Sequence, residues 1–201
     1  DLVRSRGLGD VYKRQLCEHL SLTNPVINGW SLGGAVATAA VSKLGSRAGG
    51  LVLTGGASPR YTATDDWPHG GTVDDVEQVL AGAAANRADT FRGVASVICA
   101  LPPSDDVQNW FWGMFMEMGP LGDHSMRDLA HVDLRKELGA IDVPILSLHG
   151  TDDAFVPFSA AQAAAELAND ARLVAFDGCG HAPFLEDRDR YLAELLGFLE
   201  A

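Results

Sequence analysis

The chain has 201 residues, enough for one domain but too few for two independent hydrophobic cores. Hydrophobic residues make up 47% and charged residues 21%, a composition that excludes a disordered chain. With 15 basic against 27 acidic residues, the net charge of −12 argues against binding to nucleic-acid phosphates or anionic lipid. Cys17, Cys99 and Cys179 lack disulfide or metal-ligand spacing, and no apolar run reaches the ~20 residues of a membrane span. We therefore expect a cytoplasmic protein with no nucleic-acid partner, no membrane partner and no metal.

The first fifteen residues differ from the rest of the chain. Residues 1–15 carry four of the fifteen basic residues, show no helical or strand periodicity, and end where an apolar pattern starts at Leu16. They resemble the translated adapter scar of a metagenome-derived gene fragment, so we expect a non-native leader over residues 1–15. A native basic arm is the alternative.

From Leu16 onward, short apolar runs alternate with alanine-rich or amphipathic segments, which predicts strands alternating with helices. The predicted strands are residues 25–30, 51–54, 143–148 and 173–176. The predicted helices are residues 16–22 (the end of one), 32–44, 158–168 and 191–199, the last with Leu192, Leu195, Leu196 and Leu199 on one face. Such alternation requires crossover connections, so the sequence predicts an α/β fold with a parallel sheet flanked by helices.

The middle of the chain departs from this alternation. Between residues 59 and 140 the strand-like runs disappear, and proline, tryptophan, methionine and short helical segments replace them. We interpret residues 59–140 as a helical lid inserted into a core made of residues 16–58 and 141–201. Its aromatic and methionine cluster predicts substrate contacts from Trp110, Phe111 and Met114, which would line an acyl-binding channel.

The first chemical motif follows the first predicted strand. Gly29-Trp30-Ser31-Leu32-Gly33 fits G-x-S-x-G, in which glycines permit a sharp strand-to-helix turn that leaves a strained serine exposed. An apolar strand before the motif and a small-residue helix after it favour a nucleophilic serine. The alternative is a glycine-rich turn with a bystander serine.

Two further motifs follow the third and fourth strands. A carboxylate from Asp152 or Asp153 could hold a histidine in the tautomer that accepts a serine proton. The alternative for this pair is an N-cap of the helix that starts near Pro157. His181 lies between glycines and a proline on a short loop, and it completes the order Ser…Asp…His of a nucleophile-elbow hydrolase. His149 is interpreted as a structural residue at its strand end.

With these motifs the chain resembles the α/β-hydrolase superfamily over residues 16–201. Within it, the chain is similar to the pimeloyl-carrier-protein methyl ester carboxylesterases of biotin synthesis. The segments that carry this likeness are Gly29-Trp30-Ser31-Leu32-Gly33-Gly34, Ser58-Pro59, Trp67-Pro68, Val132-Asp133-Leu134-Arg135 and Gly180-His181-Ala182-Pro183-Phe184.

The resemblance assigns roles to particular residues. It implies Ser31 as nucleophile, His181 as general base, and Asp153 rather than Asp152 as the acid that orients the base. It also implies the backbone N–H of Leu32 as an oxyanion donor and Trp30 as a wall of the acyl pocket.

The same resemblance implies a serine hydrolase that cleaves carboxylic esters through an acyl-enzyme and needs no cofactor. The substrate would be a small-molecule ester or a carrier-linked ester, with an acyl carrier protein as partner. The alternatives are a hydrolase of lactones or C–C bonds, a non-catalytic ligand-sensing member of the fold, and an inactive truncated fragment.

The chain departs from the family in two respects. The family places more sequence before its nucleophile, so we expect the early strands and the second oxyanion donor to be missing. Residues 60–137 contain thirteen acidic and six basic residues, whereas a surface that docks an acidic carrier should be basic. Arg87 and Arg92 are the candidates for a local basic patch.

Overall fold

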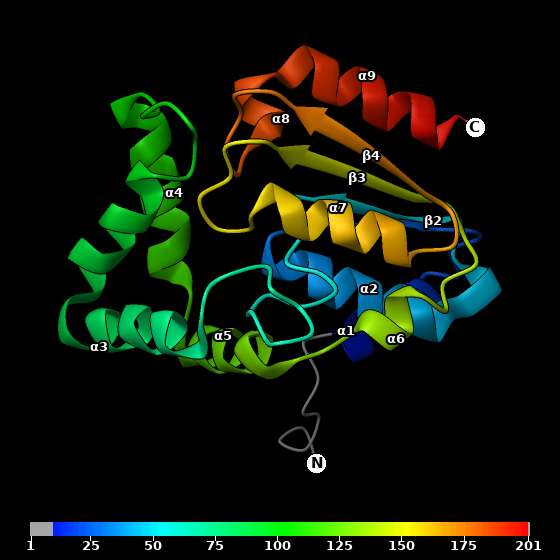
Figure 1. Ribbon diagram of the computed structural model, residues 1–201, viewed down its shortest axis with the longest axis horizontal. Coiled ribbons are helices and arrows are strands. Elements are labelled where there is room, and N and C mark those ends of the chain that lie inside the picture. The colour runs from blue at the N-terminus through cyan, green and yellow to red at the C-terminus, as the bar shows by residue number, and fades with distance from the viewer. Residues whose placement is uncertain (1–9, 201) are drawn as a thin grey trace.

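A four-stranded parallel sheet lies at the centre of the computed structural model, which describes residues 10–200 (Figure 1). In spatial order, its strands are β1 (Val26–Trp30), β2 (Gly50–Thr54), β3 (Ile145–Gly150) and β4 (Ala171–Phe176). Each begins within two residues of its predicted start, and all three neighbouring pairs are parallel. Parallel neighbours need crossover connections, so helices have to cover the faces of this sheet.

The two central strands are apolar because both of their faces are covered. Every residue of β2 and β3 is buried. Successive side chains of a strand point to opposite faces of the sheet. Accordingly, Leu51 and Leu53 belong to one core cluster, whereas Val52 lies in another cluster with Leu146 and Leu148.

Helices form a layer on each face of the sheet (Figure 1). On one face lie α1 (Asp10–His19), α2 (Leu32–Leu44), the short η1 (Gly45–Arg47), α6 (Arg135–Leu138) and α7 (Phe158–Leu167). On the other lie α8 (Pro183–Glu186) and α9 (Arg188–Leu199). The prediction of an α/β fold with a flanked parallel sheet is therefore confirmed, and α2 has the predicted bounds.

Helix α1 begins at Asp10, inside the predicted leader. Cys17 is buried in the core, and Glu18 accepts hydrogen bonds from Arg14 at 2.7 Å and Arg47 at 3.1 Å. The predicted end of a helix at residues 16–22 corresponds to α1, which begins within the predicted leader and ends at His19 rather than at Leu22. Residues 1–9 of the predicted leader lie outside the described residues.

Helix α9 buries a different face from the predicted one. Tyr191 is buried, and Leu195 and Phe198 pack partly buried beside it. Leu192 and Leu196, which belong to the predicted apolar face, are 43% and 52% exposed. Tyr191, Leu195 and Phe198, at spacings of four and three residues, therefore form the stripe of α9 that faces the sheet, and of the predicted leucines only Leu195 belongs to it.

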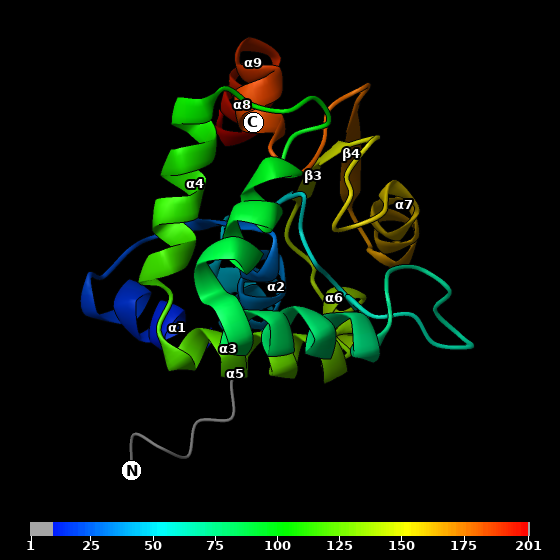
Figure 2. The ribbon, with the colours of Figure 1, turned by 90° about the vertical axis from the view of Figure 1, so that its left-hand side faces the viewer.

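Three more helices lie beyond the carboxyl ends of the strands (Figures 1 and 2). They are α3 (Val73–Ser96), α4 (Asp105–Glu117) and α5 (Pro120–His131), and they all lie between β2 and β3 in the chain. Asn86 has non-helical backbone angles and kinks α3, and its Oδ1 then accepts the N–H of Asp89 at 3.3 Å. Along residues 10–200, no helix combines the length and apolar character needed to cross a bilayer.

The two ends of this insertion meet beside the core. The N–H of Leu134 donates to the carbonyl oxygen of Pro59 at 2.9 Å. The Asp133 carboxylate pairs with Arg135 at 2.6 Å and with Arg60 at 3.3 Å. The hydrogen bonds from Arg135 are the main reason that the pKa of Asp133 falls to about 2. The segments Ser58-Pro59 and Val132-Asp133-Leu134-Arg135 thus join where the chain leaves and re-enters the core.

Candidate active site

Ser31 lies at a sharp turn between β1 and α2. Its backbone has φ 54° and ψ −126°, a region that residues other than glycine rarely adopt. A Cβ at Gly29 would lie 2.1 Å from the carbonyl oxygen of Gly33, so the turn can close this tightly only with glycine there. The Ser31 side chain makes no capping hydrogen bond to α2. The strained elbow predicted from the sequence is therefore present.

Leu32, the predicted oxyanion donor, is the first residue of α2. The first N–H groups of a helix have no carbonyl partner within the helix, and the helix dipole favours negative charge near them. Leu32 and Ser31 line the same cavity. This position suits the N–H of Leu32 to a developing oxyanion.

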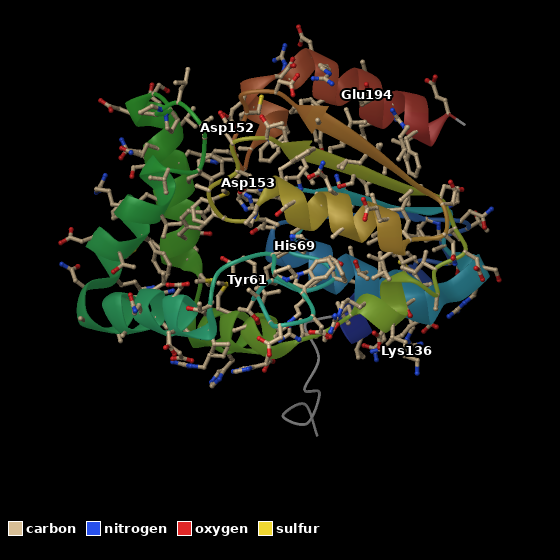
Figure 3. The ribbon with its side chains drawn as sticks, in the orientation of Figure 1. Tyr61, His69, Lys136, Asp152, Asp153 and Glu194 are labelled. Carbon is tan, nitrogen blue, oxygen red and sulfur yellow. The ribbon has the colours of Figure 1, made fainter. Side chains whose placement is uncertain are left out.

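Asp153 and His181 form a buried pair between the loops that follow β3 and β4 (Figure 3 labels Asp153). Nδ1 of His181 lies 2.8 Å from Oδ2 of Asp153, and their side chains are 4% and 0% exposed. Oδ1 of Asp153 accepts the N–H groups of Phe155 at 2.8 Å and Val156 at 2.9 Å. A carboxylate on Nδ1 keeps the proton there and leaves Nε2 able to accept another.

The charge of Asp153 is stabilised although the residue is buried. Burial by itself raises the pKa of Asp153, but the hydrogen bond and charge of His181 and the N–H of Val156 outweigh it. The pKa of Asp153 therefore lies below its ordinary value, and the side chain remains an acceptor for His181 at neutral pH.

Asp152, the other acidic candidate, does not take part in this pair. Its side chain is exposed, and its hydrogen bond is with the hydroxyl of Thr151 at 3.4 Å. The N-cap alternative is also wrong, because α7 starts after Pro157 without a side-chain cap. The structure thus brings Asp153, and not Asp152, to His181.

A second histidine shares the Asp153 carboxylate. His149 is 1% exposed, and its Nε2 lies 2.8 Å from the carbonyl oxygen of Val156 and 3.4 Å from Oδ2 of Asp153. Two acceptors on Nε2 require a proton there, which leaves Nδ1 as a buried acceptor without a partner in the described part of the chain. Burial, the largest influence, lowers the pKa of His149 despite the nearby Asp153 charge. A neutral His149 therefore helps to hold the acid.

Gly55 leaves room for the side chains of Asp153 and His181 because it has no Cβ. The sequence analysis did not identify this role. It has φ +48°, and a Cβ there would lie 3.1 Å from Nδ1 of His181 and 3.3 Å from Oδ2 of Asp153. In the sequence, a glycine at this position indicates only the end of a strand. The available signal was its place at the carboxyl edge of the sheet, where all three chemical motifs also lie.

A cavity of about 490 Å³ lies between this edge of the sheet and the insertion. Ser31 and His181 line it, and most of the remaining wall is apolar. The insertion contributes Leu80, Ala83, Val94, Phe115, Met126 and Leu129, among others. A cavity of this size and character suits a small, largely apolar ligand.

The polar lining beyond Ser31 and His181 consists of Tyr61, Thr72, Asp75 and Ser125. Burial raises the pKa of Tyr61, and the charges of Asp153 and Asp75 add to the effect, so the phenol stays neutral. No lysine or arginine of the described residues lines the cavity. The same part of the chain contains no cluster of three or more His, Cys, Asp or Glu residues that could hold a metal ion.

Of the four predicted substrate contacts, Trp30 lines this cavity and the three residues on α4 do not. Trp110 and Met114 are 53% and 37% exposed. Phe111 is fully buried, with its ring centroid 5.8 Å from that of Trp30. Helix α4 uses Phe111 to pack against the core and turns Phe115 toward the cavity, so Trp110, Phe111 and Met114 do not line this cavity, and their role as substrate contacts stays a prediction.

The chain is similar to known proteins of one family. A model of the alpha/beta hydrolase fold matches residues 7–188. The chain is 31% identical over 173 residues to the AB hydrolase superfamily protein YisY of Bacillus subtilis, covering 85% of this chain and 65% of that protein. It is 31% identical over 205 residues to the pimeloyl-[acyl-carrier protein] methyl ester esterase of Sodalis glossinidius, covering 90% of this chain and 73% of that protein. The chain thus spans about two thirds to three quarters of the length of these relatives.

The fold comparison agrees with the sequence comparison. An esterase from Exiguobacterium antarcticum superposes with a TM-score of 0.89 at 27% identity, covering 96% of this chain and 72% of that one. Together with the family match over most of the sequence, this similarity shows that the chain belongs to the alpha/beta hydrolase fold family.

Proposed function

We propose that the chain is a serine hydrolase that cleaves carboxylic esters through an acyl-enzyme. The observation that carries the proposal is the buried Asp153–His181 pair beside a cavity that Ser31 also lines. Membership of the alpha/beta hydrolase fold family and the similarity to an esterase at 27% identity support the same chemistry.

The first half of the reaction acylates Ser31. Its Oγ attacks the ester carbonyl carbon while Nε2 of His181 takes the hydroxyl proton. The carbonyl oxygen becomes an oxyanion, which the N–H of Leu32 stabilises. When the tetrahedral intermediate collapses, His181 gives its proton to the leaving alcohol, and the acyl group remains on Ser31.

The second half releases the acid. Water attacks the acyl carbonyl, Nε2 of His181 takes a proton from it, and Ser31 regains that proton as the ester bond breaks. Asp153 stays ionised and holds the proton of His181 on Nδ1 through both halves. The steps use no group other than these side chains, the backbone N–H and water.

The insertion, as we propose it, is a lid that shapes the acyl site. Leu80, Ala83 and Leu129 come from α3 and α5, and together with Trp30 they give the acyl chain apolar contacts. The charged lining residue outside the Asp–His pair is Asp75, so we expect neutral acyl groups to enter more readily than acyl groups with a free carboxylate.

The more specific candidate substrate is a pimeloyl methyl ester on an acyl carrier protein, which would place the reaction in biotin synthesis and make the carrier a partner. This candidate is supported by the similarity of the chain, at 31% identity, to the Sodalis glossinidius protein that is named for this substrate. The two arginines of the expected docking patch have other contacts: Arg87 pairs with Asp123 at 3.5 Å, and Arg92 stacks over Trp112 at 4.4 Å. We therefore rank the carrier-linked ester behind a free ester.

The esterase proposal is tested with short-chain p-nitrophenyl esters and purified chain. We expect Ser31→Ala to lower kcat/KM by about 10⁴-fold or more, with an unchanged circular dichroism spectrum. Asp152→Asn is the matched control and should keep most of the activity. Equal hydrolysis by the unmodified chain and Ser31→Ala would contradict the proposal.

The substrate is tested by comparing kcat/KM for pimeloyl methyl ester on its carrier with kcat/KM for the same ester free in solution. Faster turnover of the carrier-linked ester would support the carrier as partner. Turnover that is no better than that of the free ester would remove the carrier-linked ester from the proposal and leave ester hydrolysis in place.

A further inference from the structure

Glu186, at the end of α8, joins the loop of His181 to the insertion. Its Oε1 accepts the N–H of Gly180 at 2.9 Å and the N–H of Ala182 at 3.3 Å. Its Oε2 accepts the N–H of Ala100 at 2.7 Å. Ala100 lies 86 residues earlier in the chain, between α3 and α4, so one carboxylate connects two distant segments.

The same two segments also meet through their backbones. The N–H of His181 donates to the carbonyl oxygen of Ile98 at 2.9 Å. A Cβ at Gly180 would lie 2.5 Å from the backbone nitrogen of Ala100, so the close approach requires glycine at this position. The residues that follow α3 therefore pack directly against the loop of His181.

These contacts provide hydrogen-bond partners for the peptide groups on both sides of His181. The N–H groups of Gly180 and Ala182 bind Glu186, and the carbonyl oxygen of His181 accepts Nε1–H of Trp30 at 2.8 Å. Together with Ile98, these partners hold the peptide groups that set the direction of the imidazole. The hydrogen bond to Asp153 fixes the ring itself.

We propose that Glu186 is a positioning residue for His181 and that it links the geometry of this base to the position of the insertion. The proposal rests on the proposed esterase function. Moving the end of α3 away from the core would remove the Ala100 donor from Glu186 and the Ile98 acceptor from His181 together. His181 is therefore fully held only while the insertion lies over the cavity.

The link requires a carboxylate. Both oxygens of Glu186 accept hydrogen bonds from backbone N–H groups, and an ionised carboxylate offers acceptors on both. Glutamine has one acceptor oxygen and an NH₂ group that only donates, so we expect its oxygen to stay with the two N–H groups of Gly180 and Ala182 and its NH₂ group to face the N–H of Ala100, which then loses its acceptor.

The test compares Glu186→Gln with Glu194→Gln. Glu194, on α9, pairs with Arg172 at 2.5 Å on the surface, so its substitution also replaces a bonded carboxylate but leaves His181 untouched. The readouts are kcat and KM on a short-chain p-nitrophenyl ester, the rate at which a fluorophosphonate probe labels Ser31, and amide hydrogen exchange of the peptide that contains Ala100.

For Glu186→Gln we expect kcat and the labelling rate to fall about 10- to 100-fold, because a small misplacement of the base has an effect of this size. KM should change little, and exchange at Ala100 should become faster. Glu194→Gln should change none of these. If Glu186→Gln does not fold, Glu186→Asp keeps the charge but is too short for both sides, and the same changes are expected of it.

Wild-type kcat and labelling in the Glu186 variant would overturn the proposal. So would a lower kcat with unchanged exchange at Ala100, because the link to the insertion would then be absent. If the unmodified chain neither hydrolyses esters nor reacts with the probe, the esterase proposal fails by itself. Exchange at Ala100 still tests whether Glu186 holds the two segments together.

Discussion

The helices of the insertion, which face the viewer in Figure 2, and the sheet core behind them are built differently. The two regions form two sides of one cavity. On the core side, the reactive groups follow the ends of buried strands and are fixed by hydrogen bonds of 2.8 to 2.9 Å around Asp153. On the insertion side, apolar side chains of α3 and α5 face the cavity. In the proposed esterase, the core supplies the chemistry and the insertion selects the acyl groups that fit.

The two regions also differ in how they are stabilised. Every residue of β2 and β3 is buried, whereas Phe111 is the buried residue of α4. Aromatic and arginine contacts, such as Arg92 of α3 over Trp112 of α4 at 4.4 Å, hold the helices of the insertion to one another. Substitutions in the core should therefore lower the turnover of every ester, and substitutions in the insertion should change selectivity.

The largest effect in the core is expected from Asp153→Asn. An amide on Nδ1 of His181 favours the tautomer that cannot accept the serine proton, so kcat should fall by about 10⁴-fold for all esters. The measurement is steady-state hydrolysis of acetyl and octanoyl p-nitrophenyl esters. Asp152→Asn is the control. A comparable loss of kcat in that variant would show that the assignment of the acid to Asp153 is wrong.

A smaller effect in the core is expected from Gly55→Ala. The new Cβ would lie 3.1 Å from Nδ1 of His181 and displace the ring, so kcat should fall about 10- to 100-fold. Gly178 has φ +71° with open space around it, so Gly178→Ala carries similar backbone strain without touching the base. Similar losses of kcat in both variants would show that strain, and not contact with His181, is responsible.

In the insertion, Ala83→Phe should change selectivity and leave the chemistry intact. Ala83 is 5% exposed and lines the cavity, so a phenyl group there should lower kcat/KM about tenfold or more for octanoyl esters. Acetyl esters should be hydrolysed as before. Ala84→Phe, at the exposed neighbouring position of α3, is the control. Equal losses for both esters would contradict the assignment of α3 to the acyl site.

The smallest effect is expected where the insertion joins the core. The pKa of Asp133 is about 2 instead of 3.8, so its charge stabilises the fold above about pH 4, and this contribution is lost as the pH falls through 2. Because the site is partly exposed, Asp133→Asn should lower the free energy of unfolding by only about 0.5 kcal/mol at pH 7. Urea titrations at several pH values should show the difference from the unmodified chain vanishing near pH 2.

The core was predictable because its signals are local. An apolar run such as residues 51–54 is buried on both faces, and the glycines around Ser31 mark a turn that few other residues allow. Asp153 and His181 lie in the loops that directly follow two predicted strands, so the sequence marks them as candidates. The residues alone left Asp152 and Asp153 equivalent; the family resemblance selected Asp153, which is the residue that lies 2.8 Å from His181.

The insertion was less predictable because its contacts are long-range. The sequence does not say which face of α4 meets the core, so Phe111 and Phe115 could not be assigned to packing and to the cavity. The bond between Glu186 and Ala100 spans 86 residues and involves a backbone N–H, which leaves no trace in residue type. The same limit applies to α9, where Tyr191 and Phe198, rather than Leu192 and Leu196, join Leu195 on the buried face.

The central claim is that Ser31 is an activated nucleophile beside His181. Its most direct test is labelling of the purified, folded chain with a fluorophosphonate probe, followed by peptide mass spectrometry. We expect stoichiometric modification of Ser31 that is lost in Ser31→Ala and strongly slowed in Asp153→Asn. A chain that is folded by circular dichroism but unmodified at Ser31, or modified at another residue, would contradict it.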